Sequence, residues 1–211
     1  MDYVFISHFD SDHVGGILSL IKEIKIKNII ISKQGESSEN YEEFVDLVNQ
    51  KNINVKIVKK GEKINIENNI YFDILWPEDE LISDNILNNN SLVIKMIYNK
   101  FSMLFTGDIE KMAEDKIVNK VGEQSLKSVI LKVAHHGSST SSTQEFINAV
   151  EPKVALIGVG ENNRYGHPNN QVIERLQNQD IKIYRTDQNG EISIIVNKNG
   201  NINAITTKEN Q

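Results

Sequence analysis

All five histidines of this chain lie beside breaks at the ends of predicted strands, and this placement constrains the fold more than any other feature. The strands are predicted from short apolar runs, which alternate with segments of helical periodicity. Strands are predicted at residues 3–7, 28–32, 55–58, 64–66, 70–75, 92–98, 101–105, 128–133, 153–159, 182–185 and 191–196. Helices are predicted at residues 14–23, 39–51, 110–120, 143–150 and 171–179.

Two predicted hairpins interrupt this β/α alternation, one joining 64–66 to 70–75 and one joining 92–98 to 101–105. Hairpins mixed with helices predict a layered α/β fold with mixed sheets rather than a purely parallel, doubly wound sheet. Residues 77–90 form the longest predicted loop. We expect one domain over residues 1–211, with residues 198–211 as a tail that adds an edge strand.

Composition excludes several classes of protein. The absence of cysteine excludes disulfides, thiolate nucleophiles and cysteine-based zinc sites. No apolar stretch approaches the ~20 residues that span a bilayer, and Met1-Asp2-Tyr3 begins no signal peptide. As written, the chain is therefore expected to be soluble and cytoplasmic.

The net charge of −6 disfavours a dedicated nucleic-acid binder, which usually has a basic surface. It does not exclude an enzyme that handles phosphodiesters through bound metal ions. Two divalent cations would bring the formal charge from −6 to −2 and would concentrate positive charge at the site.

The first candidate site is the turn between the first predicted strand and helix. It holds four metal-competent side chains within six residues, namely His8, Asp10, Asp12 and His13. His8 and Asp10 could meet one cation and Asp12 and His13 a second, while Gly15-Gly16 lets the helix start approach closely. The alternative is a polar turn in which Asp12 caps the helix and the histidines are solvated. Four potential ligands at this spacing favour a metal site.

A second carboxylate, Asp108, ends the apolar strand Leu104-Phe105-Thr106-Gly107-Asp108. By itself it is a weak signal, since an aspartate after a strand often caps the next helix. A dinuclear site, however, needs a bridging anion that neutralises two cations and fixes their separation.

The other candidates follow later strands. One of the adjacent His135 and His136 could ligate a metal while the other donates a proton to a leaving group; the alternative is a pair of exposed loop histidines. In the loop 162–168, Arg164 suits an anionic substrate, and His167 could complete a metal shell or simply pack at a helix start.

Together these motifs resemble the metallo-β-lactamase fold, and within it the nuclease-like domain of ComEC-type competence proteins, with phosphorylcholine esterases as relatives. The resemblance covers residues 3 to about 196. It is carried by His8-x-Asp10-x-Asp12-His13-x-Gly15-Gly16, Thr106-Gly107-Asp108, His135-His136-Gly137-Ser138 and Arg164-Tyr165-Gly166-His167-Pro168. Asp10 stands where the wider superfamily usually has histidine, as expected of the ComEC-like branch.

The resemblance implies a four-layer αββα sandwich with two metal ions at the sheet edges. It assigns His8, Asp10 and His135 to one ion, Asp12, His13 and His167 to the other, and Asp108 as the bridge. His135 is favoured as the ligand of the adjacent pair, with His136 as the outer or proton-donating partner. The shell has no soft ligand that forces zinc, and its three carboxylates suit Mn²⁺ as well as Zn²⁺.

Family members normally begin with strands that precede the metal signature, whereas Tyr3 here opens the strand that leads into His8. The resemblance thus implies a fold without its first N-terminal strands. The strand at residues 3–7 would then lie near an unpaired edge, through which the chain would self-associate. Full-length ComEC-type relatives are membrane proteins, but this chain has no membrane segment.

The predicted function is a dinuclear metal-dependent hydrolase of phosphodiesters, acting on DNA in the manner of a competence-related nuclease. Asp12 would orient the nucleophile, His136 would protonate the leaving oxygen, and Arg164 with the loop 138–140 would hold phosphoryl oxygens. The alternatives are a small-molecule phosphodiesterase of the phosphocholine type, a lactonase, or a catalytically silent fragment. A basic strip of Lys22, Lys25, Arg164 and Arg175 would favour DNA.

Overall fold

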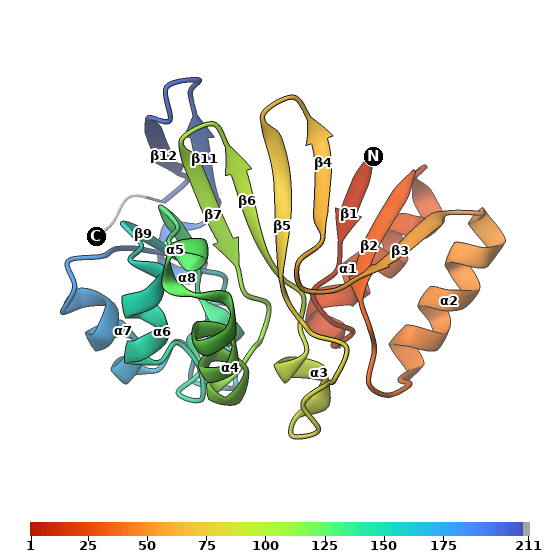
Figure 1. Cartoon of the computed structure of the whole chain (residues 1–211), viewed down its shortest axis with the longest axis horizontal. Helices are drawn as coiled ribbons and strands as arrows, with labels where there is room; N and C mark the ends of the chain where they lie inside the picture. The colour runs from red at the N-terminus through yellow and green to blue at the C-terminus, as the bar shows by residue number, and fades with distance from the viewer. Residues whose placement is uncertain (209–211) are drawn as a thin grey trace.

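Two β-sheets lie face to face, and helices cover the outer side of each (Figure 1). The computed structural model of the chain describes residues 1–208. The smaller sheet is wholly parallel, in the order β1-β2-β3. Its strands are β1 (Tyr3–Phe5), β2 (Asn28–Ser32) and β3 (Asn54–Val58).

The larger sheet is mixed, in the order β10-β9-β8-β7-β6-β5-β4. Its neighbours are antiparallel from β4 to β7 and parallel from β7 to β10. Its strands are β4 (Lys63–Glu67), β5 (Ile70–Trp76), β6 (Val93–Tyr98), β7 (Phe101–Phe105), β8 (Ile130–Lys132), β9 (Val154–Ile157) and β10 (Lys182–Arg185). A separate antiparallel pair consists of β11 (Ile192–Val196) and β12 (Ile202–Thr206).

The helices form the two outer layers and the connections. They are α1 (Ser11–Glu23), α2 (Glu39–Lys51), α3 (Ile86–Asn89), α4 (Lys111–Val121), α5 (Glu123–Leu126), α6 (Gln144–Val150), α7 (Asn170–Gln177) and α8 (Thr186–Asn189). A short 3₁₀ turn covers Ala134–Gly137.

Alternation along β2 shows how the layers arise. Ile29 and Ile31 pack into the apolar cluster beneath α1 and α2, whereas Ile30 faces the cluster between the two sheets. A strand exposes successive side chains on opposite faces, so an all-apolar strand must be covered on both sides. A third cluster lies between the larger sheet and α4, α6 and α7. The predicted αββα sandwich and both predicted hairpins are confirmed.

Three local predictions need correction. Helix α1 begins at Ser11, three residues before the predicted start, so that Asp12 and His13 lie in its first turn. The predicted loop 77–90 contains the short helix α3. The predicted tail does supply a strand, β12, but this strand pairs with β11 and not with an edge of the three-stranded or the seven-stranded sheet. Residues 209–211 of the tail lie outside the described part of the chain. Within residues 1–208, no helix combines the length and the apolarity needed to cross a membrane.

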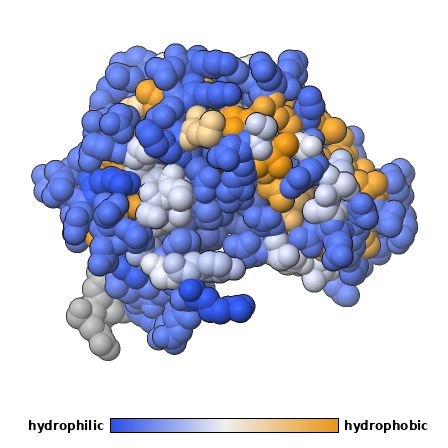
Figure 2. All heavy atoms as spheres, turned by 90° about the horizontal axis from the view of Figure 1, so that it is seen from below, coloured by the Kyte–Doolittle hydropathy of each residue, from blue (hydrophilic) through white to orange (hydrophobic). Residues whose placement is uncertain are grey.

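The edge of the smaller sheet is open along β1, which pairs only with β2 among the described strands. A cavity of about 390 Å³ next to it is lined by apolar side chains of both sheets, including Phe5, Phe72 and Phe105. Figure 2 shows hydrophobic side chains gathered on the right half of one face, the side on which Figure 1 draws β1 to β3. An unpaired strand edge beside apolar surface favours pairing with another chain.

We therefore expect the chain to form dimers or larger species at micromolar concentration, measured by light scattering. The amide of Ile6 donates to Ile30 O, so alternation points the amide of Tyr3 away from β2. Tyr3→Pro should remove that outward donor and shift the protein toward monomer, because proline blocks pairing at a sheet edge. Tyr3→Ala, which keeps the amide, is the control. A wild-type protein that stays monomeric would contradict the expectation.

Burial of Glu114 predicts a pH dependence of stability. Glu114 is fully buried, and its carboxylate accepts the amides of Ser142 and Thr143, which ties α4 to the start of α6. Burial raises the pKa of Glu114 to about 7 despite these two hydrogen bonds. A carboxyl whose pKa is higher in the folded than in the unfolded state contributes stability at low pH, and this contribution is lost as the pH rises through the folded-state pKa.

Between pH 4.5 and about 7, wild type should accordingly lose about 3 kcal/mol of unfolding free energy relative to Glu114→Gln. Urea unfolding of both metal-free proteins across this range measures the difference. A difference that does not vary with pH would show that Glu114 ionises as an ordinary carboxyl.

Candidate metal centre

The predicted site residues meet where strand ends from both sheets come together. Strands β7, β8 and β9 are parallel neighbours, so the segments after them, which carry Asp108, His135 and Gly158, leave the same edge of the sheet. Open α/β sheets bind ligands at such carboxyl ends. His8 follows β1 of the smaller sheet. The amide of Leu92 donates to Ser7 O at 2.8 Å, and this hydrogen bond joins the two sheets next to His8.

Gly107 allows these segments to approach one another. Its φ is +55°, and a Cβ there would lie 2.7 Å from Ser91 Cβ and 3.0 Å from Ser7 Cβ. Only glycine tolerates both the left-handed conformation and the close contact. Next to it, the amide of Asp108 donates to Ser91 Oγ at 3.2 Å, and the amide of His135 donates to Gly107 O at 3.1 Å.

The first motif wraps around the start of α1. Asp10 is the N-cap residue, but its side chain makes no capping hydrogen bond, and its Oδ2 lies 3.5 Å from His8 Nε2. Asp12 does not cap the helix, as the alternative interpretation required; its carboxylate lies 3.7 Å from His13 Nε2. The carboxylates of this turn therefore face imidazoles rather than backbone amides.

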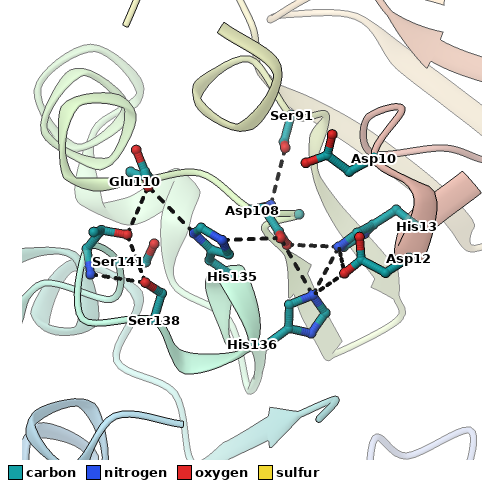
Figure 3. Close-up of polar contacts among 12 residues, drawn as sticks. Asp10, Asp12, His13, Ser91, Asp108, Glu110, His135, His136, Ser138 and Ser141 are labelled. Atoms are coloured by element: carbon teal, nitrogen blue, oxygen red, sulfur yellow. Dashed lines mark hydrogen bonds and ion pairs between the residues drawn. The ribbon is translucent and has the colours of Figure 1, made fainter. Parts of the chain in front are cut away.

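Asp108 lies at the centre of the cluster, and its two oxygens face different groups (Figure 3). Oδ1 lies 3.2 Å from His13 Nε2. Oδ2 lies 3.5 Å from His136 Nε2, 3.9 Å from His135 Nε2 and 4.0 Å from His8 Nε2. Each oxygen therefore faces at least one imidazole nitrogen that could share a cation with it.

Both adjacent histidines reach Asp108, but they are held differently. Their φ angles are +48° and +54°, a left-handed conformation that costs about 1–3 kcal/mol per non-glycine residue. His136 Nδ1 lies 2.6 Å from Gly158 O, and its Nε2 lies 3.1 Å from His13 Nε2 and 3.3 Å from Asp12 Oδ2. His135 Nδ1 faces Glu110 Oε1 at 3.6 Å, too long for a hydrogen bond.

A cavity of about 490 Å³ opens over the cluster. Its lining includes Asp10, Asp12, Asp108, His135, His136 and His167. His167 stands 5.8 Å from the His135 ring, centroid to centroid, and stacks with Tyr165, which also lines the cavity and is 80% exposed. Arg164 is exposed and does not line the cavity.

Ser138 and Thr140, predicted as contacts for phosphate, instead bond to each other at 3.0 Å. The Thr140 hydroxyl also lies 2.9 Å from Glu110, and Thr140 lines a different cavity.

The charges of the cluster shift several pKa values. Burial by itself would raise the pKa of Asp108, but the contact with His13 and the nearby His8 and His136 outweigh it and hold that pKa well below its usual range. The contact with His8 likewise lowers the pKa of Asp10. Burial, reinforced by His135, lowers the pKa of His167, which favours the neutral imidazole that metal ligation requires.

Unpaired buried atoms indicate that this donor set fits cations. Within residues 1–208, His8 Nε2, Asp108 Oδ1 and His135 Nδ1 are buried without a hydrogen-bond partner. Two groups of three, His8 with His13 and Asp108, and Asp12 with His13 and His136, each have their donor atoms within 4.8 Å of one another. Donors that bind cations at about 2.0–2.2 Å lie at such separations. The two groups have His13 in common and divide the donors differently from the resemblance, which assigns His8 and His13 to different ions and leaves His136 outside the shell.

Three residues near the cluster were not predicted from the sequence. Ser7 bonds to two histidines, Ser91 supports Asp108, and Glu110 faces His135 (Figure 3 for the latter two). Ser7 precedes the first motif directly, which is the one local signal that could have found it. Ser91 and Glu110 act on neighbours that are brought close only by folding.

Comparisons with known proteins agree with this geometry. The family model described as "Metallo-beta-lactamase superfamily" matches residues 1–161. The chain is 36% identical to ComE operon protein 3 of Bacillus subtilis over 91% of its length, and 30% identical to competence protein ComA of Neisseria gonorrhoeae over 95%. These alignments cover 24% and 26% of the relatives, so the chain spans about a quarter of the length of the proteins it matches.

Among solved structures, a mutant of the CmlA beta-hydroxylase matches with a TM-score of 0.60 at 13% identity. The match covers 88% of this chain and 43% of the other. At that identity the likeness concerns the fold alone.

We expect the purified, metal-loaded chain to hold close to two divalent ions, as measured by elemental analysis. Asp108→Ala should reduce this to one or none, because it removes the carboxylate that faces both groups of imidazoles. Asp73→Asn is the control, since Asp73 pairs with Lys63 on the surface of the larger sheet. Stoichiometry near zero in the loaded wild type would contradict a metal centre here.

Proposed function

The chain belongs to the metallo-β-lactamase superfamily, and we propose that it is a dinuclear, metal-dependent phosphodiesterase that cleaves DNA. The superfamily and the competence-protein relatives support a metal-dependent hydrolase related to competence. The observation that carries the finer proposal is the buried Asp108, whose two oxygens face separate donor groups at the base of a cavity.

In this proposal His8, Asp10 and His135 would hold one ion, Asp12, His13 and His167 would hold the other, and Asp108 would contribute to both sites. Bound Zn²⁺ or Mn²⁺ would supply Lewis-acid charge and a water of lowered pKa. Side chains of the protein would orient the nucleophile and protonate the leaving group. Asp12, which is 65% exposed at its side chain and lines the cavity, orients the nucleophile.

His136 is the proposed proton donor. Its Nδ1 faces Gly158 O, which fixes this nitrogen as the N–H and turns Nε2 toward Asp12 and the cavity. Protonated at Nε2, the ring can donate to the oxygen of the leaving group. Because Nε2 also lies near His13 and Asp108, metal ligation by His136 is the competing assignment, and one variant separates the two.

His136→Gln should keep both ions. It should slow cleavage of DNA, whose leaving group is an alkoxide, by about 10²–10⁴-fold. Cleavage of bis-p-nitrophenyl phosphate should fall much less, since nitrophenolate leaves without a proton. Turnover on the two substrates and metal content by elemental analysis are the measurements. Loss of an ion would instead make His136 a ligand, and wild type without activity on either substrate would contradict the phosphodiesterase assignment.

Two residues of the loop 160–167 would contact the substrate. The exposed Tyr165 at the cavity is suited to stacking on a nucleobase, and base–aromatic stacking is typical of single-strand binding. Arg164, exposed on the same loop, would reach a phosphate outside the cavity.

A small phosphodiester such as a phosphocholine ester is the second candidate substrate. The basic strip that would favour DNA is weakened, because Lys22 pairs with Glu43 at 2.7 Å and Arg175 donates to Ser142 O at 3.0 Å. Together with the net charge of −6, this favours a small ligand in the cavity of about 490 Å³. Parallel assays on linear DNA and on a phosphocholine ester decide between them. The cytoplasmic location that the sequence predicts remains a prediction.

A further inference from the structure

The Ser7 backbone is held at the junction of the two sheets. Its carbonyl accepts the amide of Leu92, which directly precedes β6 of the larger sheet, at 2.8 Å. Gly107, which follows β7, lies next to it, and a Cβ there would be 3.0 Å from Ser7 Cβ. Ser7, which follows β1 of the smaller sheet, is thus held against the larger sheet before any contact of its hydroxyl is considered.

The hydroxyl of Ser7 lies between two imidazoles. Ser7 Oγ is 3.1 Å from His8 Nδ1 and 3.2 Å from His13 Nδ1. The two rings are 4.1 Å apart, centroid to centroid, and tilted by 46°. Their other nitrogens point to different carboxylates, His8 Nε2 to Asp10 Oδ2 at 3.5 Å and His13 Nε2 to Asp108 Oδ1 at 3.2 Å.

A neutral imidazole can ligate a cation only through its unprotonated nitrogen, and the other nitrogen then carries a proton that needs an acceptor. A hydroxyl oxygen has two lone pairs and can accept two such protons at once. Each ring would then present a bare Nε2 to an anionic oxygen, an arrangement that is favourable only with a cation between them. The buried, unpartnered His8 Nε2 agrees with this tautomer among the described residues.

We infer that Ser7 is a positioning residue for both metal sites. Its single oxygen accepts Nδ1–H from His8, assigned to one ion, and from His13, assigned to the other. This rests on the proposed metal binding, but it adds a coupling between the two sites that the ligands by themselves do not supply. The other imidazoles lack this shared partner, since His136 Nδ1 faces Gly158 O and His135 Nδ1 faces Glu110.

The first test is metal affinity of the full chain, measured by competition with a chromophoric chelator for Zn²⁺. Ser7→Ala should weaken binding of both ions by about 10–100-fold, the usual effect of losing a partner behind a ligand. The number of ions bound at saturation should stay the same. Ser32→Ala is the matched control, because Ser32 is a buried serine at the end of the neighbouring strand β2 whose hydroxyl donates to Asn90 O.

The second test reads the Nδ1–H protons directly by ¹H–¹⁵N NMR of the imidazoles in the Zn²⁺-loaded protein at pH 8. In wild type, the Nδ1–H protons of His8 and His13 should both exchange slowly with water because Ser7 Oγ accepts them, and Ser7→Ala should speed the exchange of both while Ser32→Ala leaves it unchanged. Exchange that Ser7→Ala leaves unchanged, or affinities within about twofold of wild type for both ions, would overturn the inference while leaving the phosphodiesterase proposal intact. A wild type that binds two ions but cleaves no phosphodiester would sink that proposal, and the affinity and NMR results would still decide the role of Ser7.

Discussion

The carboxylate of Asp108 is buried, and the arrangement around it follows from the need to compensate its charge. An unpaired charge in a protein interior costs several kcal/mol, so it persists only with partners that neutralise it. The Nε2 atoms of His8, His13, His135 and His136 all lie within 4.0 Å of its oxygens. These imidazoles come from two different sheets, so the site exists only when the whole sandwich has formed.

Bringing four rings around one carboxylate places demands on the backbone. Gly107 must be glycine because Ser7 and Ser91 pack where its side chain would be. His135 and His136 adopt a left-handed conformation that is costly for residues with a Cβ, and such strain is typical of functional sites. The hydrogen bond from Leu92 to Ser7 fixes the distance between the two sheets at this point. Stability is thus given up locally in exchange for a fixed geometry of donors.

For the proposed function, the same geometry gives a way in which an acidic protein could act on an anionic substrate. The carboxylates of Asp10, Asp12 and Asp108 would repel a phosphodiester, and bound cations are what would reverse the sign of the site. The basic residues outside the site are partly occupied, since Lys22 and Arg175 are engaged with other groups. In the proposed function, recognition would therefore depend chiefly on the ions, with contributions from Tyr165 and Arg164 in the adjacent loop.

Much of the fold was predictable from sequence because its signals are local. Short apolar runs predict strands such as β2, and the hairpins follow from short turns. The dense spacing of His8, Asp10, Asp12 and His13 indicates a metal-binding turn. These features depend on neighbours along the chain, and periodicity reports neighbours. The family resemblance and the pairing of Asp108 with this turn follow from the same motifs.

Only the tertiary structure determined which atoms of those residues face one another. It starts α1 at Ser11, so that His13 lies in the first turn and its Nδ1 reaches Ser7. It brings Glu110 to His135 and places Arg164 outside the cavity, and neither relation has a sequence signal. The tautomer and direction of an imidazole depend on contacts between segments that meet only when both sheets pack, and no local pattern contains that information.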